Sequence, residues 1–194
     1  MPAGAAAPAG AKKHTMITDK IKWDRKYEPT SADAFGEAQI YVADTTPEIV
    51  WRNLTNMSDW TRFDKRIVDI NFEDSADNDP HLFDKAQFYY DTNSGKRIRC
   101  TVIDFVHPKD DRSGRLAYQG SAFDENGNAL FTMVAEFLVG VPDKKGEFQL
   151  AAGVTIKGKV ADGQYAGLDS ELMAALGELA SRSKQAELRH EKTK

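Results

Sequence analysis

The architecture of this chain follows from the stretch GQYAGLDSELMAALGELASRSKQAELR, at residues 163–189. Its apolar and small residues recur at steps of three and four, which places one stripe along an α-helix: Leu168, Leu172, Leu176, Leu179, Ser183 and Ala186. Some twenty helical residues span roughly 30 Å, about the width of a small domain. We therefore expect this helix to cross a whole sheet. Gly177 lies beside the stripe, either as a tolerated glycine or because another group approaches it closely.

The residues before this helix are predicted to be mainly β-strands. In residues 35–42, Ala38, Ile40 and Val42 share one side of the chain, while polar side chains and a tyrosine occupy the other. Six further segments alternate in the same way and are separated by polar turns: 66–72, 85–91, 96–106, 115–121, 130–139 and 148–158. The pattern predicts an α+β fold in which a seven-stranded antiparallel sheet wraps around the C-terminal helix.

Two short helices are predicted after the first strand. Thr46 can cap a helix whose first position is Pro47, and Glu48 favours the positive end of the helix dipole. Ser58 can start a further turn that carries Trp60.

The N-terminal residues 1–33 are set apart from the domain at residues 34–190. Residues 1–15 are rich in Ala, Gly and Pro and offer little to bury, so we expect a low-complexity, largely disordered tail. The following residues mix charge with Ile21, Trp23 and Tyr27, and whether they dock on the domain stays open.

Composition narrows the class of protein. The 194 residues are 41% hydrophobic and 29% charged, and the net charge of −4 argues against nucleic acid or an anionic membrane as the primary partner. The single cysteine, Cys100, excludes an intramolecular disulfide framework and a Cys-based zinc site with the usual number of ligands. No stretch approaches the ~20 apolar residues of a membrane span, so we expect no stable membrane insertion and a cytoplasmic protein. A homodimer stays open.

Residues 39–51, QIYVADTTPEIVW, followed by Met57-Ser58-Asp59-Trp60, resemble the opening of the START-like (SRPBCC) superfamily. This superfamily includes polyketide cyclase/dehydrase-like proteins, lipid-transfer START domains and pollen allergens of the birch type. Matching positions are occupied by Pro47, Val50, Trp51, Leu54 and Trp60. The resemblance covers roughly residues 35–189. It implies a helix-grip fold, in which a curved sheet and the long helix enclose a cavity that binds a hydrophobic small molecule.

The inward faces of the predicted strands and helix supply the candidate ligand-binding residues: Trp60, Phe88, Tyr90, Cys100, Tyr118, Met133, Phe137, Ala152, Leu172 and Leu176. Buried tyrosines need partners for their hydroxyls, so Tyr90 and Tyr118 are candidates for orienting a polar group of the ligand. The alternative is that each hydroxyl reaches solvent or a backbone carbonyl.

Catalytic groups are scarce in this pattern. Asp104 continues the face of Ile98, Cys100 and Val102 by alternation, and near a cavity mouth it could act as a base; the alternative is a charged strand end facing water. Cys100 has no basic neighbour on its own side and is interpreted as a small apolar residue. No spacing supports a metal or nucleotide site, and we expect no cofactor.

Three functions remain from the sequence. The preferred one is binding or transport of a lipid, isoprenoid or polyketide-like molecule without catalysis. The second is a cyclase- or dehydrase-like enzyme that uses Asp104, Tyr90 and Tyr118. The third is a protein-interaction module, which an exposed patch of Trp23 and Tyr27 would favour.

Overall fold

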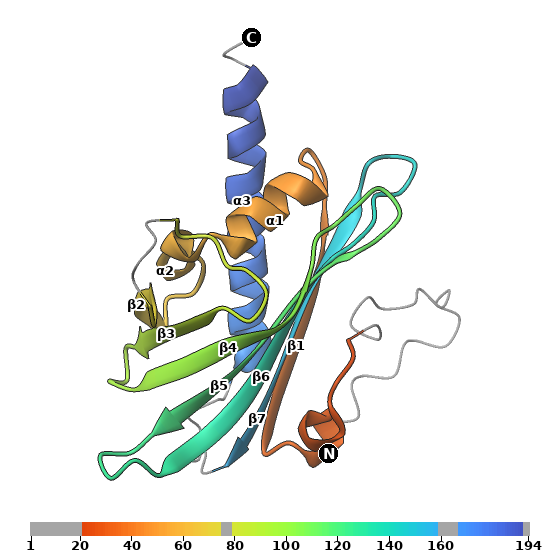
Figure 1. The fold of residues 1–194 in the computed structure, drawn as a ribbon. Coiled ribbons are helices and arrows are strands. Elements are labelled where there is room, and N and C mark those ends of the chain that lie inside the picture. Colours follow the sequence, from red (N-terminus) through yellow and green to blue (C-terminus); the bar gives the residue numbers. More distant parts are fainter. Residues whose placement is uncertain (1–20, 75–78, 159–166, 192–194) are drawn as a thin grey trace.

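The computed structural model describes residues 21–74, 79–158 and 167–191. Seven antiparallel strands form one sheet in the order β1-β7-β6-β5-β4-β3-β2 (Figure 1). The strands are β1 (Ala34–Val42), β2 (Ile67–Phe72), β3 (Gln87–Thr92), β4 (Arg97–Val106), β5 (Gly114–Phe123), β6 (Ala129–Val139) and β7 (Phe148–Gly158). The predicted seven-stranded α+β fold is confirmed, and the strand bounds lie within a few residues of those predicted from alternation.

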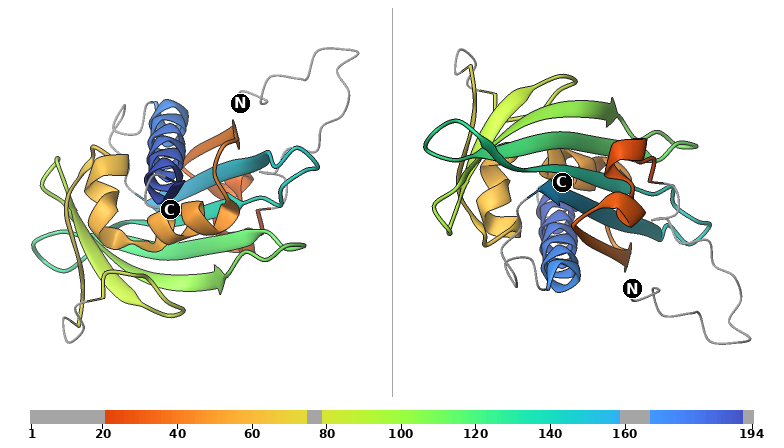
Figure 2. Two further views of the ribbon diagram at one scale, coloured as in Figure 1. Left: turned by 90° about the horizontal axis from the view of Figure 1, so that it is seen from above. Right: turned by 90° about the horizontal axis from the view of Figure 1, so that it is seen from below.

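The C-terminal helix α3 (Leu168–Glu191) packs on one face of the curved sheet, beside β1 (Figures 1 and 2). The predicted leucine stripe is buried there. Contact with β1 is close, because a Cβ added to Gly36 would lie 2.6 Å from Cβ of Leu168. The backbone N–H of Glu37 also donates a 2.8 Å hydrogen bond to Asp169 Oδ1. Gly177 has open space around it: within the described residues, no group makes the close approach that the sequence allowed.

The two predicted helices follow β1 as α1 (Pro47–Thr55) and, after the 3-10 turn η4 (Met57–Asp59), α2 (Trp60–Phe63). Thr46 caps α1 as predicted, since its side chain accepts the N–H of Ile49 at 3.3 Å. Polar contacts fix α1 and the turn η4 to α3: Asn53 of α1 donates to Ser183 Oγ at 3.0 Å, and Asp59 of η4 pairs with Arg182 at 3.1 Å. One end of the space between sheet and α3 is thereby closed.

Residues 21–33, called here the N-terminal segment, dock on the opposite face of the sheet (Figure 1). They contain the 3-10 turns η2 (Arg25–Tyr27) and η3 (Pro29–Ser31). Ile21 and Trp23 lie over Gly153 of β7, where an added Cβ would come within 2.9 Å of both side chains. Tyr27 is buried. The docking that the sequence left open is therefore observed for this segment, and residues 1–20 lie outside the described part.

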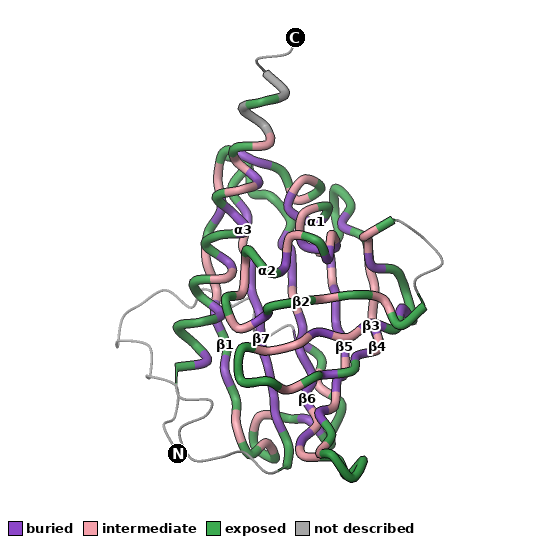
Figure 3. The backbone as a smooth tube through the Cα atoms, turned by 90° about the vertical axis from the view of Figure 1, so that its left-hand side faces the viewer, coloured by how far each residue is buried: buried purple, intermediate pink, exposed green. Residues whose placement is uncertain are grey.

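The N-terminal segment covers part of the outer face of the sheet, over β6 and β7. Figure 3 shows long buried stretches in β5, β6 and β7, where residues of both faces are buried. A carboxylate lies under this cover: Glu136 is buried, pairs with Arg115 and accepts the backbone N–H of Lys22. Burial raises the pKa of Glu136 to about 7, although Arg115 acts in the opposite direction.

Candidate ligand-binding cavity

A cavity of about 250 Å³ lies between the sheet and α3, roofed by the segment from α1 to β2. Its interior is mostly apolar and aromatic: Leu54, Trp60, Phe63, Ile67, Tyr90, Ile98, Tyr118, Phe131, Met133, Phe137, Val154, Ile156, Leu168, Leu172, Ala175, Leu176 and Leu179. Polar residues gather where the β3–β4 turn, the start of β2 and the first turns of α3 meet: Asp64, Arg66, Thr92, Asn93, Ser94, Lys96 and Glu171. We call these seven residues the rim. The cavity thus has an apolar body and one polar side.

Aromatic rings fix the deeper wall. Tyr118 on β5 has its ring centroid 5.5 Å from that of Trp60 and 5.4 Å from that of Phe88, and it stacks on Phe137 at 6.5 Å. Trp60 is held in turn by its indole N–H, which donates to the carbonyl of Leu54 at 2.7 Å. Because each ring is packed on several sides, the Tyr118 hydroxyl is held in one place.

The two tyrosine hydroxyls in this wall are poorly satisfied. Tyr90 donates to the thioether sulfur of Met133 at 3.2 Å, and a thioether is a weak acceptor. Tyr118 lines the cavity, and no hydrogen-bond partner for its hydroxyl is found among the residues that the structure describes. Burial raises the pKa of both tyrosines well above the ordinary range, so both stay protonated and able to donate.

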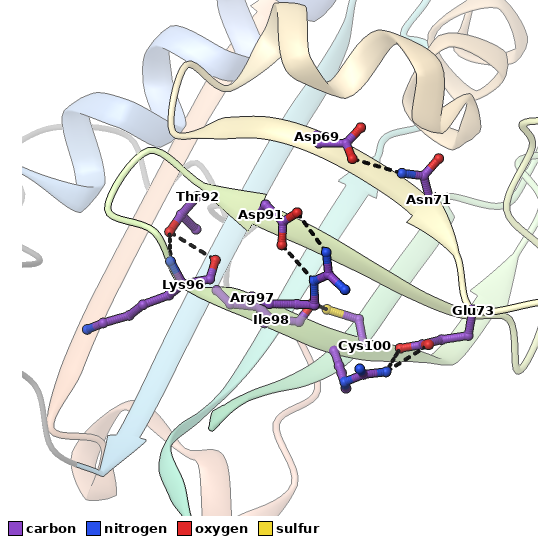
Figure 4. Close-up of polar contacts among 10 residues, drawn as sticks. Asp69, Asn71, Glu73, Asp91, Thr92, Lys96, Arg97, Ile98 and Cys100 are labelled. Atoms are coloured by element: carbon purple, nitrogen blue, oxygen red, sulfur yellow. Dashed lines mark hydrogen bonds and ion pairs between the residues drawn. The ribbon is translucent and has the colours of Figure 1, made fainter. Parts of the chain in front are cut away.

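The charges of the rim are mostly paired with one another. The Arg66 guanidinium binds both carboxylate oxygens of Asp64, at 3.0 and 2.7 Å, and reaches Glu171 on α3 at 3.0 Å. In the β3–β4 turn, Thr92 and Lys96 are joined by hydrogen bonds (Figure 4). The Lys96 ammonium lies 5.8 Å from the centre of the Phe131 ring. The Arg66–Glu171 pair therefore bridges the sheet side of the cavity and α3.

Seven of the ten predicted ligand-binding residues line the cavity: Trp60, Tyr90, Tyr118, Met133, Phe137, Leu172 and Leu176. The other three, Phe88, Cys100 and Ala152, are buried on the same side of the sheet but do not line it. Phe88 stands behind Trp60 and Tyr118. Cys100 lies against Gly120 of β5, where a Cβ would come within 2.7 Å of its sulfur.

Asp104 is the prediction that the geometry overturns. β4 and β5 shift register between Val102 and Asp104, so one extra residue enters β4 and reverses the alternation. Asp104 consequently lies outside the cavity, half-exposed, with its carboxylate 3.7 Å from Arg115. The next residue, Phe105, packs against Trp51 in the core instead.

The rim was not predicted from the sequence. Its members stand in turns and at element ends, where alternation carries no information, and only the tertiary fold brings Arg66 close to Glu171. The one available signal is the charge of Asp64 and Arg66 directly before a strand.

Other reactive groups do not assemble here. Burial raises the pKa of the Cys100 thiol far above its ordinary range, which suppresses the nucleophilic thiolate. Within the described ranges, no group of three or more His, Cys, Asp or Glu side chains could hold a metal ion. None of the helices in those ranges is long and apolar enough to cross a membrane.

No known protein family and no curated protein matches the sequence. Solved structures do match the fold. A hypothetical protein of Helicobacter pylori is similar over 84% of this chain and 95% of its own, with a TM-score of 0.71 and 20% identity. A START superfamily protein of Mycobacterium smegmatis gives a TM-score of 0.52 at 11% identity, over 78% of this chain and 98% of its own.

Ara h 8.0201 is similar to the same degree, with a TM-score of 0.52 and 10% identity over 77% of this chain and 98% of its own. At these identities the likeness shows the fold alone. Together with the open seven-stranded sheet, the short helices after β1 and the long α3, it confirms the helix-grip fold that the sequence predicts.

Proposed function

We propose that this protein binds a hydrophobic small molecule in the cavity between its sheet and α3. The observation that carries the proposal is the cavity itself, a space of about 250 Å³ lined mainly by apolar and aromatic side chains. Water gains little from apolar walls of this kind, so an apolar ligand that displaces it binds favourably. Burial of apolar ligand surface, worth ~25 cal/mol per Å², supplies the main driving force.

The alternatives have less support. The enzymatic hypothesis loses its candidate base, since Asp104 lies outside the cavity. The interaction hypothesis needs an exposed patch of Trp23 and Tyr27, whereas Tyr27 is buried and Trp23 is half-buried. Transport of the ligand and a cytoplasmic location stay predictions from the sequence, and a homodimer stays open.

Mass spectrometry of the natively purified protein tests the proposal. We expect a stoichiometric hydrophobic compound, which organic extraction would release for identification. The matched variants are Ala175→Leu and Ala174→Leu, neighbours on α3 of which only Ala175 lines the cavity. Filling the cavity at position 175 should reduce the bound compound severalfold, and the substitution at the exposed position 174 should not.

A protein that is purified empty and does not take up an apolar fluorophore would contradict the proposal. Equal ligand content in the Ala175→Leu and Ala174→Leu variants would show that the compound is held elsewhere.

A further inference from the structure

We propose that the ligand is a compact, uncharged molecule with an oxygen acceptor, such as a carbonyl or ether oxygen, that receives a hydrogen bond from Tyr118. This inference rests on the proposed function and names the class of ligand for the same cavity. It concerns three properties of the ligand: the acceptor, the absence of charge and the size.

The acceptor follows from the state of Tyr118. Its side chain is 6% exposed and its ring is fixed by Trp60, Phe88 and Phe137, yet its hydroxyl has no partner in the described part of the chain. A donor that a ligand shields from water is destabilised unless the ligand gives it a partner, because buried polar groups are almost always satisfied. A ligand that fills the cavity lined by Tyr118 must therefore present an acceptor to this hydroxyl, since a group that receives O–H is an acceptor.

Tyr90 supplies a second donor to the same cavity. Its hydroxyl donates to the Met133 sulfur at 3.2 Å, an interaction that an oxygen acceptor can replace at little cost because sulfur accepts weakly. Each of these neutral donors can serve an oxygen acceptor of the ligand. The two carboxylates that line the cavity, those of Asp64 and Glu171, already accept from Arg66 at the rim, so the apolar wall offers a ligand donors rather than acceptors.

The absence of charge follows from the rim. Arg66 is already bound to two carboxylates, those of Asp64 and Glu171, and Lys96 is the remaining cation. The formal charges of these four residues cancel, which leaves no excess positive charge to attract an anion. A carboxylate placed at Tyr118 would also give up its hydration for an apolar interior, which is unfavourable without a dedicated cation.

The size follows from the volume. A space of about 250 Å³ lies below the roughly 300–1,000 Å³ of common ligand pockets. It suits one small ring system and excludes a lipid with two acyl chains.

Three probes of one shape test the proposal: fluorene, 9-fluorenone and fluorene-9-carboxylate. Their dissociation constants are measured by equilibrium dialysis near neutral pH against the wild-type protein, Tyr118→Phe and Tyr89→Phe. Tyr89 is the matched control, because it is the neighbour of Tyr90 on the other face of β3 and stacks under Arg97 outside the cavity. The preference for fluorenone over fluorene, compared between variants, isolates the hydrogen bond from differences in hydrophobicity.

In Tyr118→Phe, we expect the ratio of the dissociation constants of fluorene and fluorenone to fall about fivefold, while the dissociation constant of fluorene stays nearly unchanged. In Tyr89→Phe, we expect the wild-type ratio. The carboxylate should bind more weakly than fluorenone throughout. Binding of fluorene with an unchanged preference in Tyr118→Phe, or tighter binding of the carboxylate, would overturn this inference and leave the proposed function standing. Failure of all three probes to bind the folded wild-type protein would overturn both.

Discussion

Replacing Glu136 by Gln tests whether one buried carboxyl controls how the stability of this protein depends on pH. Glu136 is 2% exposed and lies under the N-terminal segment, with Arg115 and the Lys22 N–H as partners. Burial raises the pKa of this carboxyl to about 7, from an ordinary value of 4.5. The folded protein therefore holds the proton more tightly than the unfolded chain does.

The sign and size of the effect follow directly. Below about pH 4.5 both states are protonated, and the carboxyl adds no pH dependence. Between about pH 4.5 and 7 the unfolded chain loses the proton first, so the free energy of unfolding falls as the pH rises. One pKa unit corresponds to about 1.4 kcal/mol, which sets a ceiling of about 3 kcal/mol; some hydration of the pair reduces the expected loss to about 2 kcal/mol.

Urea unfolding of the wild type and of Glu136→Gln at about pH 4.5 and about pH 7.5 measures this loss. Glutamine cannot titrate, so the variant should lack the component of about 2 kcal/mol, while all other groups titrate equally in both proteins. Glu147→Gln, at an exposed position in the β6–β7 turn, should behave as the wild type. The same pH dependence in the wild type and Glu136→Gln would mean that Arg115 keeps the carboxylate ionised, and the reasoning from burial would be wrong.

Three further outcomes follow from the packing. Gly177→Ala should raise the free energy of unfolding by up to about 1 kcal/mol in urea titrations, because the new methyl group meets nothing within 4 Å and alanine favours the helix; a loss of stability would contradict the exposed position. Gly120→Ala should lower the free energy of unfolding by about 1–3 kcal/mol, because its Cβ would lie 2.7 Å from the Cys100 sulfur. Unchanged stability would show that β4 and β5 can shift to make room for the methyl group. Deleting residues 1–33 should destabilise the protein by roughly 2–4 kcal/mol through loss of buried Ile21 and Tyr27, yet leave uptake of an apolar probe intact; an unchanged melting temperature would argue against the docked segment.

Much of this fold was predictable because its elements have simple periods. The leucine stripe of α3 and the alternation in β5 and β6 each specify which side chains face the core, so the sequence places Tyr118 and Met133 correctly in the wall. Local capping rules likewise locate the start of α1 at Thr46 and Pro47. Each of these signals depends only on neighbouring residues in the sequence, and the structure confirms the elements that they predict.

The wrong or missing predictions concern segments in which the strand alternation is interrupted, or turns that have no periodic pattern. One inserted residue in β4 turns Asp104 away from the cavity, and nothing in the sequence marks that bulge. The rim depends on turns whose relative positions only the assembled sheet determines. The burial of the outer face of β6 under the N-terminal segment was also not predicted. A polar residue such as Glu136 in an alternating strand normally indicates a side that faces solvent.

The contact between α3 and β1 also bears on aggregation. β1 is a terminal strand of an open sheet, and an uncovered strand of this kind is a template for pairing with other chains. Here the side chain of Asp169 occupies the backbone N–H of Glu37, and Leu168 presses against Gly36. A strand of a second chain could pair with β1 only after displacing the first turn of α3. The helix that encloses the cavity therefore also blocks polymerisation through this edge strand.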